Sequence, residues 1–402
     1  MKGANVIWIS VDSLRRDFLH TYNPERSRST YLDDLAAQGC VFENAFPGGN
    51  WTMPSHASML AGLDSTSHMV WSWAHRFAAG TQTAFDFFRR AGYTSGCFAI
   101  QQLRDLFSGL PIDHVGNTDD PGLLKCIESP KPFFIFWHTY NVHYPYGMVL
   151  PKDYDDAEAD YDHPSRTLNY LRSLIVAGRT DIIFDSYRRE IQRTARFIYG
   201  ITNKLKQLGK FDRTYFIVTA DHGEAWEPHT TFHCNFKEEV LRVPLFITGP
   251  GISQTRVISP VSQVSLLPTV LQLCEIDAGD SVEAFDGESL VLAMSKDPEE
   301  SHPVIVAGPD GLRSRHHYLA IRNREWMLIS ALNHWGESFH RIGKDGHSDN
   351  LLDRPLVDEG RKSLDEFRAI AERHTERFLS KKINVVELSS GIEKRLRALG
   401  YL

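Results

Sequence analysis

The sequence predicts an α/β fold: a mostly parallel central sheet flanked by helices, with a small C-terminal α+β subdomain. Two observations lead to this prediction. Short, nearly continuous apolar runs alternate with segments that carry apolar residues at helical spacing. Strands that alternate with helices form βαβ units, and uninterrupted apolar runs are typical of strands buried on both faces of a parallel sheet.

Four segments have the length and composition of buried strands. They span residues 6–11, 133–137, 215–219 and 244–248, and polar residues follow most of them. Each is rich in branched or aromatic apolar side chains, which favour extended backbone when the segment is this short. We therefore expect all four strands in the parallel sheet.

Helical patterns lie between these strands. Segments 30–38, 83–91 and 184–208 are each followed by a glycine, which is a common helix terminator. Segment 265–273 carries leucine and valine at helical spacing. We expect helices at these four places.

The composition shifts after about residue 300. Segment 316–333 has the pattern of a hairpin, and 363–379 that of an amphipathic helix. We therefore expect a catalytic domain over residues 1–300 and a subdomain over 301–402 that completes the same fold. Segment 147–180 has mixed charge and few periodic apolar residues, so we interpret it as a long functional loop or lid.

Charge and hydropathy narrow the class of partner. The net charge is −7, which argues against a nucleic-acid partner because such proteins need a basic face. The apolar run at the start is too short to span a membrane and lacks a cleavage site after it, and no other segment is long enough. Five scattered cysteines without a CxxC pair fit a reducing compartment. We expect a cytoplasmic protein that contacts no membrane; the oligomeric state stays open.

Acidic residues directly follow two of the expected strands. Asp12 follows the first strand, and Asp221 with His222 follows the third. Ligands of open α/β sheets bind beyond the carboxyl ends of the strands, where carboxylates and an imidazole suit a divalent cation. The alternative is that each aspartate caps the turn or helix after its strand.

Thr52 stands shortly before Pro54, a residue favoured at the first helical position. Thr52 is then either an ordinary N-cap or a hydroxyl placed where the helix dipole favours an alkoxide and an anionic substrate. As a nucleophile it would need a metal or a base for activation. His138 and His143 follow the second strand and are candidates for a general acid or an oxyanion donor, although a lone histidine is more often structural.

These motifs, in their order, resemble the sulfatase family of the alkaline phosphatase superfamily over nearly the whole chain. The segments that carry the resemblance are ANVIWISVDSLRRD, YLDDLAAQGCVFENAF, WTMPSHASMLAGL, PFFIFWHTYNVHYPY, LGKFDRTYFIVTADHGE, FKEEVLRVPLFITGPG, VSQVSLLPTVLQLCEI and EKRLRALGYL. The resemblance implies an alkaline phosphatase-like fold and a metal-dependent ester hydrolase whose substrate is a small anionic ester.

The resemblance also assigns residues. It implies that one divalent cation (Mn, Mg, Ca or Zn) is held by Asp12, Thr52, Asp221 and His222, with Thr52 as nucleophile. His143 resembles the histidine that contacts substrate. His233 lies near the position of a lysine that binds substrate in sulfatases, and Lys237 is the competing candidate. His56 and His138 are expected on the substrate side.

Three departures from the family pattern affect the chemistry. Thr52 replaces the cysteine or serine that becomes formylglycine, His56 replaces an arginine, and Ser13 replaces the second aspartate of the opening motif. Family members with threonine at this position are phosphodiesterases and phosphoryl-group transferases, so the resemblance favours phosphate mono- or diesters. A sulfate-ester hydrolase, a phosphomutase and a non-catalytic metal-binding protein are the alternatives. The segment HTYNVH offers no aspartate for a second cation, so we expect one.

Overall fold

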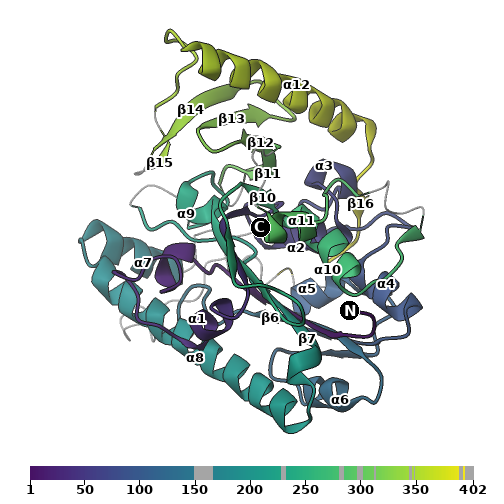
Figure 1. The fold of residues 1–402 in the computed structure, drawn as a ribbon. Helices are drawn as coiled ribbons and strands as arrows, with labels where there is room; N and C mark the ends of the chain where they lie inside the picture. Colours follow the sequence, from purple (N-terminus) through teal and green to yellow (C-terminus); the bar gives the residue numbers. More distant parts are fainter. Residues whose placement is uncertain are drawn as a thin grey trace.

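The computed structural model describes residues 1–148, 166–227, 232–279, 285–296, 302–311, 314–343, 346–347, 349–388 and 393. Within these residues, a large sheet lies between two layers of helices and a second, antiparallel sheet sits at one end (Figure 1). The large sheet is formed by β1 (Asn5–Val11), β2 (Cys40–Phe46), β4 (Thr94–Phe98), β5 (His114–Gly116), β6 (Phe133–Thr139), β7 (Thr214–Thr219), β8 (Val243–Thr248), β9 (Thr255–Val257) and β10 (Val261–Ser262). Its strand order is β10-β2-β8-β7-β1-β6-β4-β5, and β9 pairs with β2.

The helices between the strands cover both faces of this sheet (Figure 1). One layer holds α1 (Tyr31–Ala36), α7 (Arg166–Val176) and α8 (Thr180–Gln207); the other holds α2 (Thr52–Ala61), α4 (Ala84–Arg90), α5 (Gln101–Leu106) and α10 (Leu266–Leu273). The shorter α3 (Ser65–His68), α6 (Gly122–Glu128), α9 (Glu238–Leu241) and α11 (Val291–Ser295) lie in the connections. The four expected helices are thus confirmed as α1, α4, α8 and α10.

Strand direction departs from the expectation at one place. The central strand β1 is parallel to both β6 and β7, as expected. β8 is antiparallel to both of its neighbours, β7 and β2, so the expectation that this segment is a parallel strand was wrong. An apolar run in the sequence indicates that a strand is buried on both faces, but it does not indicate the direction of the strand. The connection from β7 to β8 stays at the edge of the sheet where β7 ends, since Thr219 pairs with Leu245, and β8 therefore runs back in the opposite direction.

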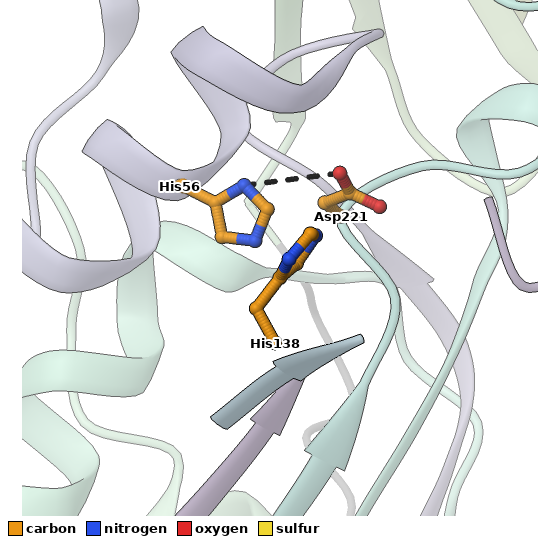
Figure 2. A group of neighbouring side chains, drawn as sticks. All are labelled: His56, His138 and Asp221. Atoms are coloured by element: carbon orange, nitrogen blue, oxygen red, sulfur yellow. Dashed lines mark ion pairs between the residues drawn. The ribbon is translucent and has the colours of Figure 1, made fainter. Parts of the chain in front are cut away.

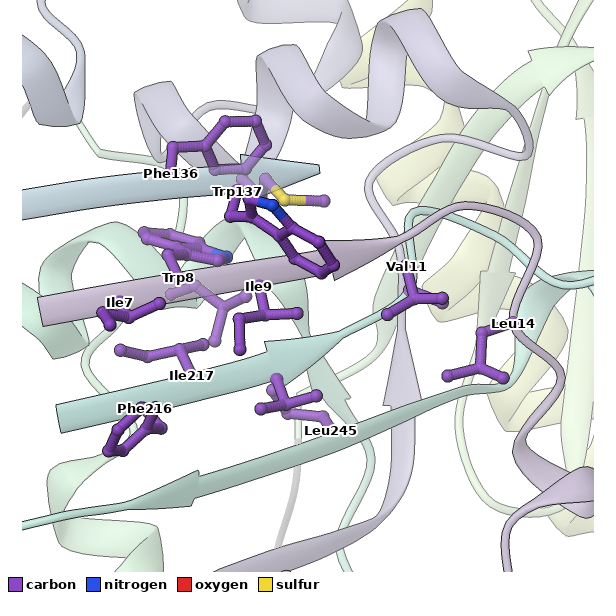
Figure 3. Close-up of a cluster of buried hydrophobic side chains, with 14 of the residues drawn as sticks. Ile7, Trp8, Ile9, Val11, Leu14, Phe136, Trp137, Phe216, Ile217 and Leu245 are labelled. Carbon is purple, nitrogen blue, oxygen red and sulfur yellow. The ribbon is translucent and has the colours of Figure 1, made fainter. Parts of the chain in front are cut away.

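Both faces of the central strands are packed with large side chains. Side chains from β1, β6, β7 and β8 interlock around Trp8 and Ile9 (Figure 3). On β6, Phe134 stacks on Phe88 of α4 with ring centroids 4.3 Å apart, whereas Trp137 stacks on Phe197 of α8 at 5.0 Å. Side chains alternate between the faces of a strand, so β6 is held between the two helical layers, and its last residues have fixed directions at the sheet edge.

The second sheet is built by the C-terminal part of the chain. It contains β11 (Val304–Pro309), β12 (His317–Arg322), β13 (Trp326–Ala331), β14 (Glu337–Gly343) and β15 (Gly346–His347). The expected hairpin is β12 and β13, and α12 (Asp358–Ser380) begins five residues before the predicted helix and lies against this sheet (Figure 1). Side chains of both sheets share one buried cluster with α9, in which Phe46 of β2 and Val240 of α9 join Val306 of β11 and Met327 of β13. The division into two domains stays a prediction.

Two smaller features complete the description. β3 (His75–Arg76) and β16 (Asn384–Val385) form a short antiparallel pair. Part of the expected loop at 147–180 is helical, since it contains α7, which packs against α8. Residues 149–165 lie outside the described residues. Among the described helices, none combines the length and apolar character needed to cross a membrane.

Candidate active site

The carboxyl ends of the central strands bring two acidic residues together. β1 and β7 are adjacent and parallel, so the residues that follow them, Asp12 and Asp221, emerge at the same edge of the sheet. The potential ligand atoms of Asp12, Asp221 and His222 all lie within 4.8 Å of one another, and all three side chains are fully buried. The three residues predicted to share a cation are therefore neighbours in space.

Thr52 is the first residue of α2. The N-cap is Trp51, in extended conformation, and Pro54 is the third helical residue. The preceding turn approaches the helix closely, since a Cβ on Gly49 would lie 2.6 Å from the Pro54 ring. The Thr52 Oγ1 atom lies 3.4 Å from Nε2 of His222. Thr52 therefore does not act as the N-cap, and its hydroxyl faces the carboxylate cluster.

This donor set fits a single divalent cation. Nδ1 of His222 donates to the Gly223 carbonyl (2.8 Å), which leaves Nε2 as the ring's lone-pair nitrogen. Oδ2 of Asp221 lies 3.5 Å from that nitrogen and is buried without a hydrogen-bond partner among the described residues. A cation bound at about 2.0–2.6 Å from its ligands holds ligand atoms no more than roughly 5 Å apart. A buried, unsatisfied carboxylate oxygen beside a correctly oriented imidazole is what such a cation requires.

The electrostatics of the cluster also favour a cation. Burial raises the pKa of Asp12 above its ordinary value. Burial lowers the pKa of His222, but the carboxylates of Asp221 and Asp12 outweigh it and leave that pKa above the usual value. The two carboxylates thus attract positive charge to the position between them and His222.

A second group, His56, His138 and Asp221, lies beside the first (Figure 2). His56 Nδ1 donates to the Thr52 carbonyl (2.8 Å), and its Nε2 accepts from the Ser10 hydroxyl (2.9 Å). Both ring nitrogens are therefore engaged inside the protein, and burial lowers the pKa of His56 to about 3. This ring supports the backbone of Thr52 and has no nitrogen left for a second cation; its expected contact with substrate stays a prediction.

His138 and Ser13 hold the carboxylates in place. His138 Nε2 lies 3.2 Å from Oδ2 of Asp12. Ser13 donates its hydroxyl to Oδ1 of Asp12 (2.8 Å) and its backbone N–H to Oδ1 of Asp221 (3.1 Å). The serine that replaces the second aspartate of the family motif therefore links the two remaining carboxylates instead of adding a third.

His233 belongs to the same buried cluster. Its ring centroid lies 4.7 Å from that of His222, and its Nδ1 lies 3.0 Å from Oε1 of Glu224. The Tyr146 hydroxyl donates to the other carboxyl oxygen of Glu224 (3.0 Å). Burial lowers the pKa of His233 to about 3 and raises the pKa of Glu224 to about 8. Sequence reasoning did not select Glu224; its position two residues after His222 was the only available signal.

The two remaining candidates differ in position. His143 is buried next to His233, with ring centroids 5.4 Å apart; its Nδ1 donates to the Tyr144 carbonyl and its Nε2 lies 2.9 Å from the Tyr140 hydroxyl. Lys237 precedes α9, and its ammonium group lies 2.8 Å from Oε2 of Glu227. Of the two competing residues, the structure brings His233 to the cluster and pairs Lys237 with Glu227.

Comparison with known proteins gives a consistent result. The family model described as Sulfatase matches residues 4–104 and 122–276. Human arylsulfatase K is 31% identical over 413 residues, which cover 83% of this chain and 74% of that protein. The low-salt glycan biosynthesis sulfotransferase Agl7 of Haloferax volcanii is 27% identical over 461 residues, and the match covers 99% of this chain and 96% of the relative.

Solved structures share the fold. A protein of Bacteroides thetaiotaomicron assigned as a sulfatase superposes with a TM-score of 0.73 at 18% identity and covers 96% of both chains. The phosphonate monoester hydrolase of Agrobacterium radiobacter superposes with a TM-score of 0.69 at 16% identity, covering 92% of this chain and 96% of that one. At this level of identity, these two likenesses describe the fold alone.

Proposed function

This chain belongs to the sulfatase family, an enzyme family of ester hydrolases, and we propose that it cleaves small anionic phosphate mono- or diesters with Thr52 as the nucleophile. The observation that carries the proposal is the position of the Thr52 hydroxyl, 3.4 Å from Nε2 of His222 at the start of α2. A hydroxyl at a helix N-terminus beside two carboxylates has an anion-binding backbone on one side and cation ligands on the other.

Asp12, Asp221, His222 and the Thr52 oxygen would hold one divalent cation, with Mn, Mg, Ca and Zn as candidates. When bound, such a cation supplies charge compensation for the ester and lowers the pKa of the hydroxyl. Ser13 and His138 keep the Asp12 carboxylate oriented, because each lies within hydrogen-bond distance of one of its oxygens.

The proposed reaction has two steps. The Thr52 hydroxyl loses its proton to solvent, its oxygen attacks phosphorus to form a Thr52–phosphorus bond, and the bond to the leaving oxygen breaks with its electron pair. Water then attacks phosphorus, the Thr52–phosphorus bond breaks, and the Thr52 oxygen takes back a proton from the water; the product is phosphate from a monoester or a phosphate monoester from a diester.

Protonation of the leaving oxygen falls to the buried histidines. When the Glu224 carboxyl is protonated, it donates a hydrogen bond to Nδ1 of His233, so the ring carries its own hydrogen on Nε2. That hydrogen can pass to the leaving oxygen while the Glu224 proton moves onto Nδ1, so the ring stays neutral. His143 is adjacent to His233, and we assign it to binding a non-bridging oxygen, for which its Nε2 must release the Tyr140 hydroxyl. Glu224 is thus a positioning residue for His233.

Sulfate-ester hydrolysis is the second candidate, and the name of the human relative favours it. Threonine cannot become the formylglycine aldehyde, so an O-linked sulfo-threonine would lack the hemiacetal route for expelling sulfate. We therefore rank phosphorus esters first. The Haloferax relative is named a sulfotransferase, which suggests a third candidate: a transferase that passes the phosphoryl or sulfuryl group to an acceptor other than water.

One experiment tests the proposal directly. Purified protein is supplied separately with Mn²⁺, Mg²⁺, Zn²⁺ and Ca²⁺, and turnover is measured on paired aryl phosphate mono- and diesters, an aryl phosphonate and an aryl sulfate. We expect a phosphorus ester to be fastest, Thr52→Ala to lose turnover and Thr52→Ser to retain part of it. Near wild-type phosphoesterase activity in Thr52→Ala, or an aryl sulfate turned over much faster than every phosphorus ester, contradicts the proposal. Cation binding without turnover of any ester would instead indicate a non-catalytic protein.

We also propose that the protein acts in the cytoplasm, because its five scattered cysteines, without a CxxC pair, fit a reducing compartment. Recovery of the native protein mainly from a membrane or secreted fraction contradicts this assignment.

A further inference from the structure

A cleft of about 950 Å³ lies between the ends of β2 and β10 and the second sheet, and its size suits a small ligand. Phe46 and Asn44 of β2 line one side, and Ile342 and Gly343 of β14 line the other. Arginines dominate its remaining surface: Arg15, Arg16, Arg26, Arg242, Arg322 and Arg324. The two sheets therefore build this site together.

The charges that line the cleft are unbalanced. Six arginines and three acidic residues, Asp17, Glu238 and Glu239, line the cleft, and a fourth carboxylate, Glu43, pairs with Arg16 from outside the lining; the whole chain carries a net charge of −7. Asp17 is shared by two arginines, since it pairs with Arg15 at 2.9 Å and also with Arg26. A positive cleft in an acidic protein concentrates the field on anionic ligands.

The positive charge of Arg242 is not paired with a carboxylate among the described residues. Its Nε donates to the Glu43 carbonyl (3.2 Å), and no carboxylate lies within ion-pair distance of it in the described part of the chain. Burial lowers the pKa of Arg242 to about 10, and the charge of Arg16 acts in the same direction. Nearby, Arg322 is only 4% exposed and pairs with Glu238, yet its Nε has no hydrogen-bond partner among the described residues.

We propose that this cleft is an anion-binding subsite that takes a second oxyanion group (phosphate, sulfate or carboxylate) of the molecule that carries the scissile ester. Guanidinium groups bind oxyanions through paired N–H donors, and a bound oxyanion would supply negative charge beside Arg242 and a hydrogen-bond acceptor for Nε of Arg322. The substrate class is then an ester with at least two anionic groups. The link to the substrate rests on the proposed function.

Arg15 and Glu239 join the cleft to the active site. Arg15 lines the cleft and donates to the Glu224 carbonyl (3.1 Å), and the Glu224 N–H donates to the carbonyl of Glu239, another lining residue (3.1 Å). Glu224 in turn contacts His233 at 3.0 Å. One residue, Glu224, therefore connects the cleft wall to the buried histidine, and Arg15 follows β1 at the same edge of the sheet as Asp12.

Binding is tested first, on the metal-loaded protein, by calorimetric titration with inorganic phosphate and then inorganic sulfate at low and high salt. We expect Arg242→Gln and Arg324→Gln each to lose one binding site or to weaken it by roughly tenfold or more. The matched control is Arg256→Gln, because Arg256 pairs with Glu43 beside the cleft but does not line it. Unchanged phosphate and sulfate binding in both cleft variants overturns the subsite.

Kinetics then test its use by substrate. We compare an aryl phosphate ester with an otherwise identical ester that carries a second phosphate, sulfate or carboxylate. Arg242→Gln should lower kcat/KM for the doubly anionic esters by roughly tenfold and leave the simple ester unchanged. An equal loss on both kinds of ester indicates a structural effect and overturns the proposal. If wild type turns over no ester, the proposed function fails, while the titration still decides whether the subsite exists.

Discussion

The Thr52 hydroxyl and Nε2 of His222 lie 3.4 Å apart although the two residues are separated by 170 positions in the chain. Two further contacts hold the start of α2 at this place. The Ser55 hydroxyl donates to the Asp221 carbonyl (2.6 Å), and His56 Nδ1 donates to the Thr52 carbonyl (2.8 Å). The first turn of α2 is thus fixed against the end of β7, and the nucleophile and cation ligands form one rigid unit.

The first prediction concerns the cation. Asp221→Asn keeps the shape of the side chain but removes its charge, so cation affinity should fall by at least about tenfold and turnover should fall in parallel. Metal content of the purified protein and activity at rising cation concentration measure the two effects. Asp34→Asn, on the exposed side of α1, is the control and should change neither. Full occupancy in Asp221→Asn would contradict the assignment of Asp221 as a ligand.

The second prediction concerns Glu224. Glu224→Gln preserves the size of the buried group but disturbs the pairing with Nδ1 of His233, so kcat should fall by about 10–100-fold while cation content stays unchanged. Steady-state kinetics and metal analysis separate these readouts. Glu227→Gln alters the partner of Lys237 outside the buried cluster and should leave kcat within about twofold of wild type. Equal kcat values in Glu224→Gln and wild type would argue against a positioning role.

The third prediction concerns the contact between the second sheet and the nucleophile turn. Asn50 donates its side-chain amide to the Pro309 carbonyl (2.8 Å) and lies two residues before Thr52. Asn50→Ala leaves buried carbonyls unsatisfied, so unfolding free energy should fall by about 1–3 kcal/mol and kcat should fall with it. Asn384→Ala removes a similar amide-to-carbonyl bond at the surface and serves as the control. Chemical denaturation of both variants checks the difference; equal losses would mean that burial of Asn50 contributes nothing.

The fourth prediction concerns pH. Burial, with the neighbouring Asp286 carboxylate second, raises the pKa of Asp64 to about 7 from 3.8. A carboxyl group with a raised folded-state pKa binds more protons in the folded state, so it lowers stability as pH rises from about 4 to 7. Asp64→Asn should therefore be more stable than wild type by about 1–3 kcal/mol near pH 8, and the difference should shrink near pH 4. Urea denaturation at both values tests this; a variant less stable than wild type near pH 8 would refute it.

Local sequence patterns determined the main elements of the fold. The apolar runs before Asp12 and Asp221 are buried strands, and the segment around Pro54 begins a helix, because burial and backbone preference are encoded within a few neighbouring residues. The parallel pairing of β1 with β7 then makes the two aspartates neighbours, since carboxyl ends of parallel strands share one edge. The sequence thus predicts that each aspartate follows a buried strand, whereas the adjacency of these two strands is a property of the tertiary structure.

Only the tertiary structure decided relationships between distant segments. The sequence could not decide whether His233 or Lys237 belongs to the active-site cluster, because both follow the same motif. The structure shows that Glu224 contacts His233, whereas Lys237 pairs with Glu227. It also missed the direction of β8, since an apolar strand is buried equally well in either direction. The arginine cleft joins residues after β1 to β12, more than 300 positions apart. Such contacts depend on sheet register and packing, which no local pattern specifies.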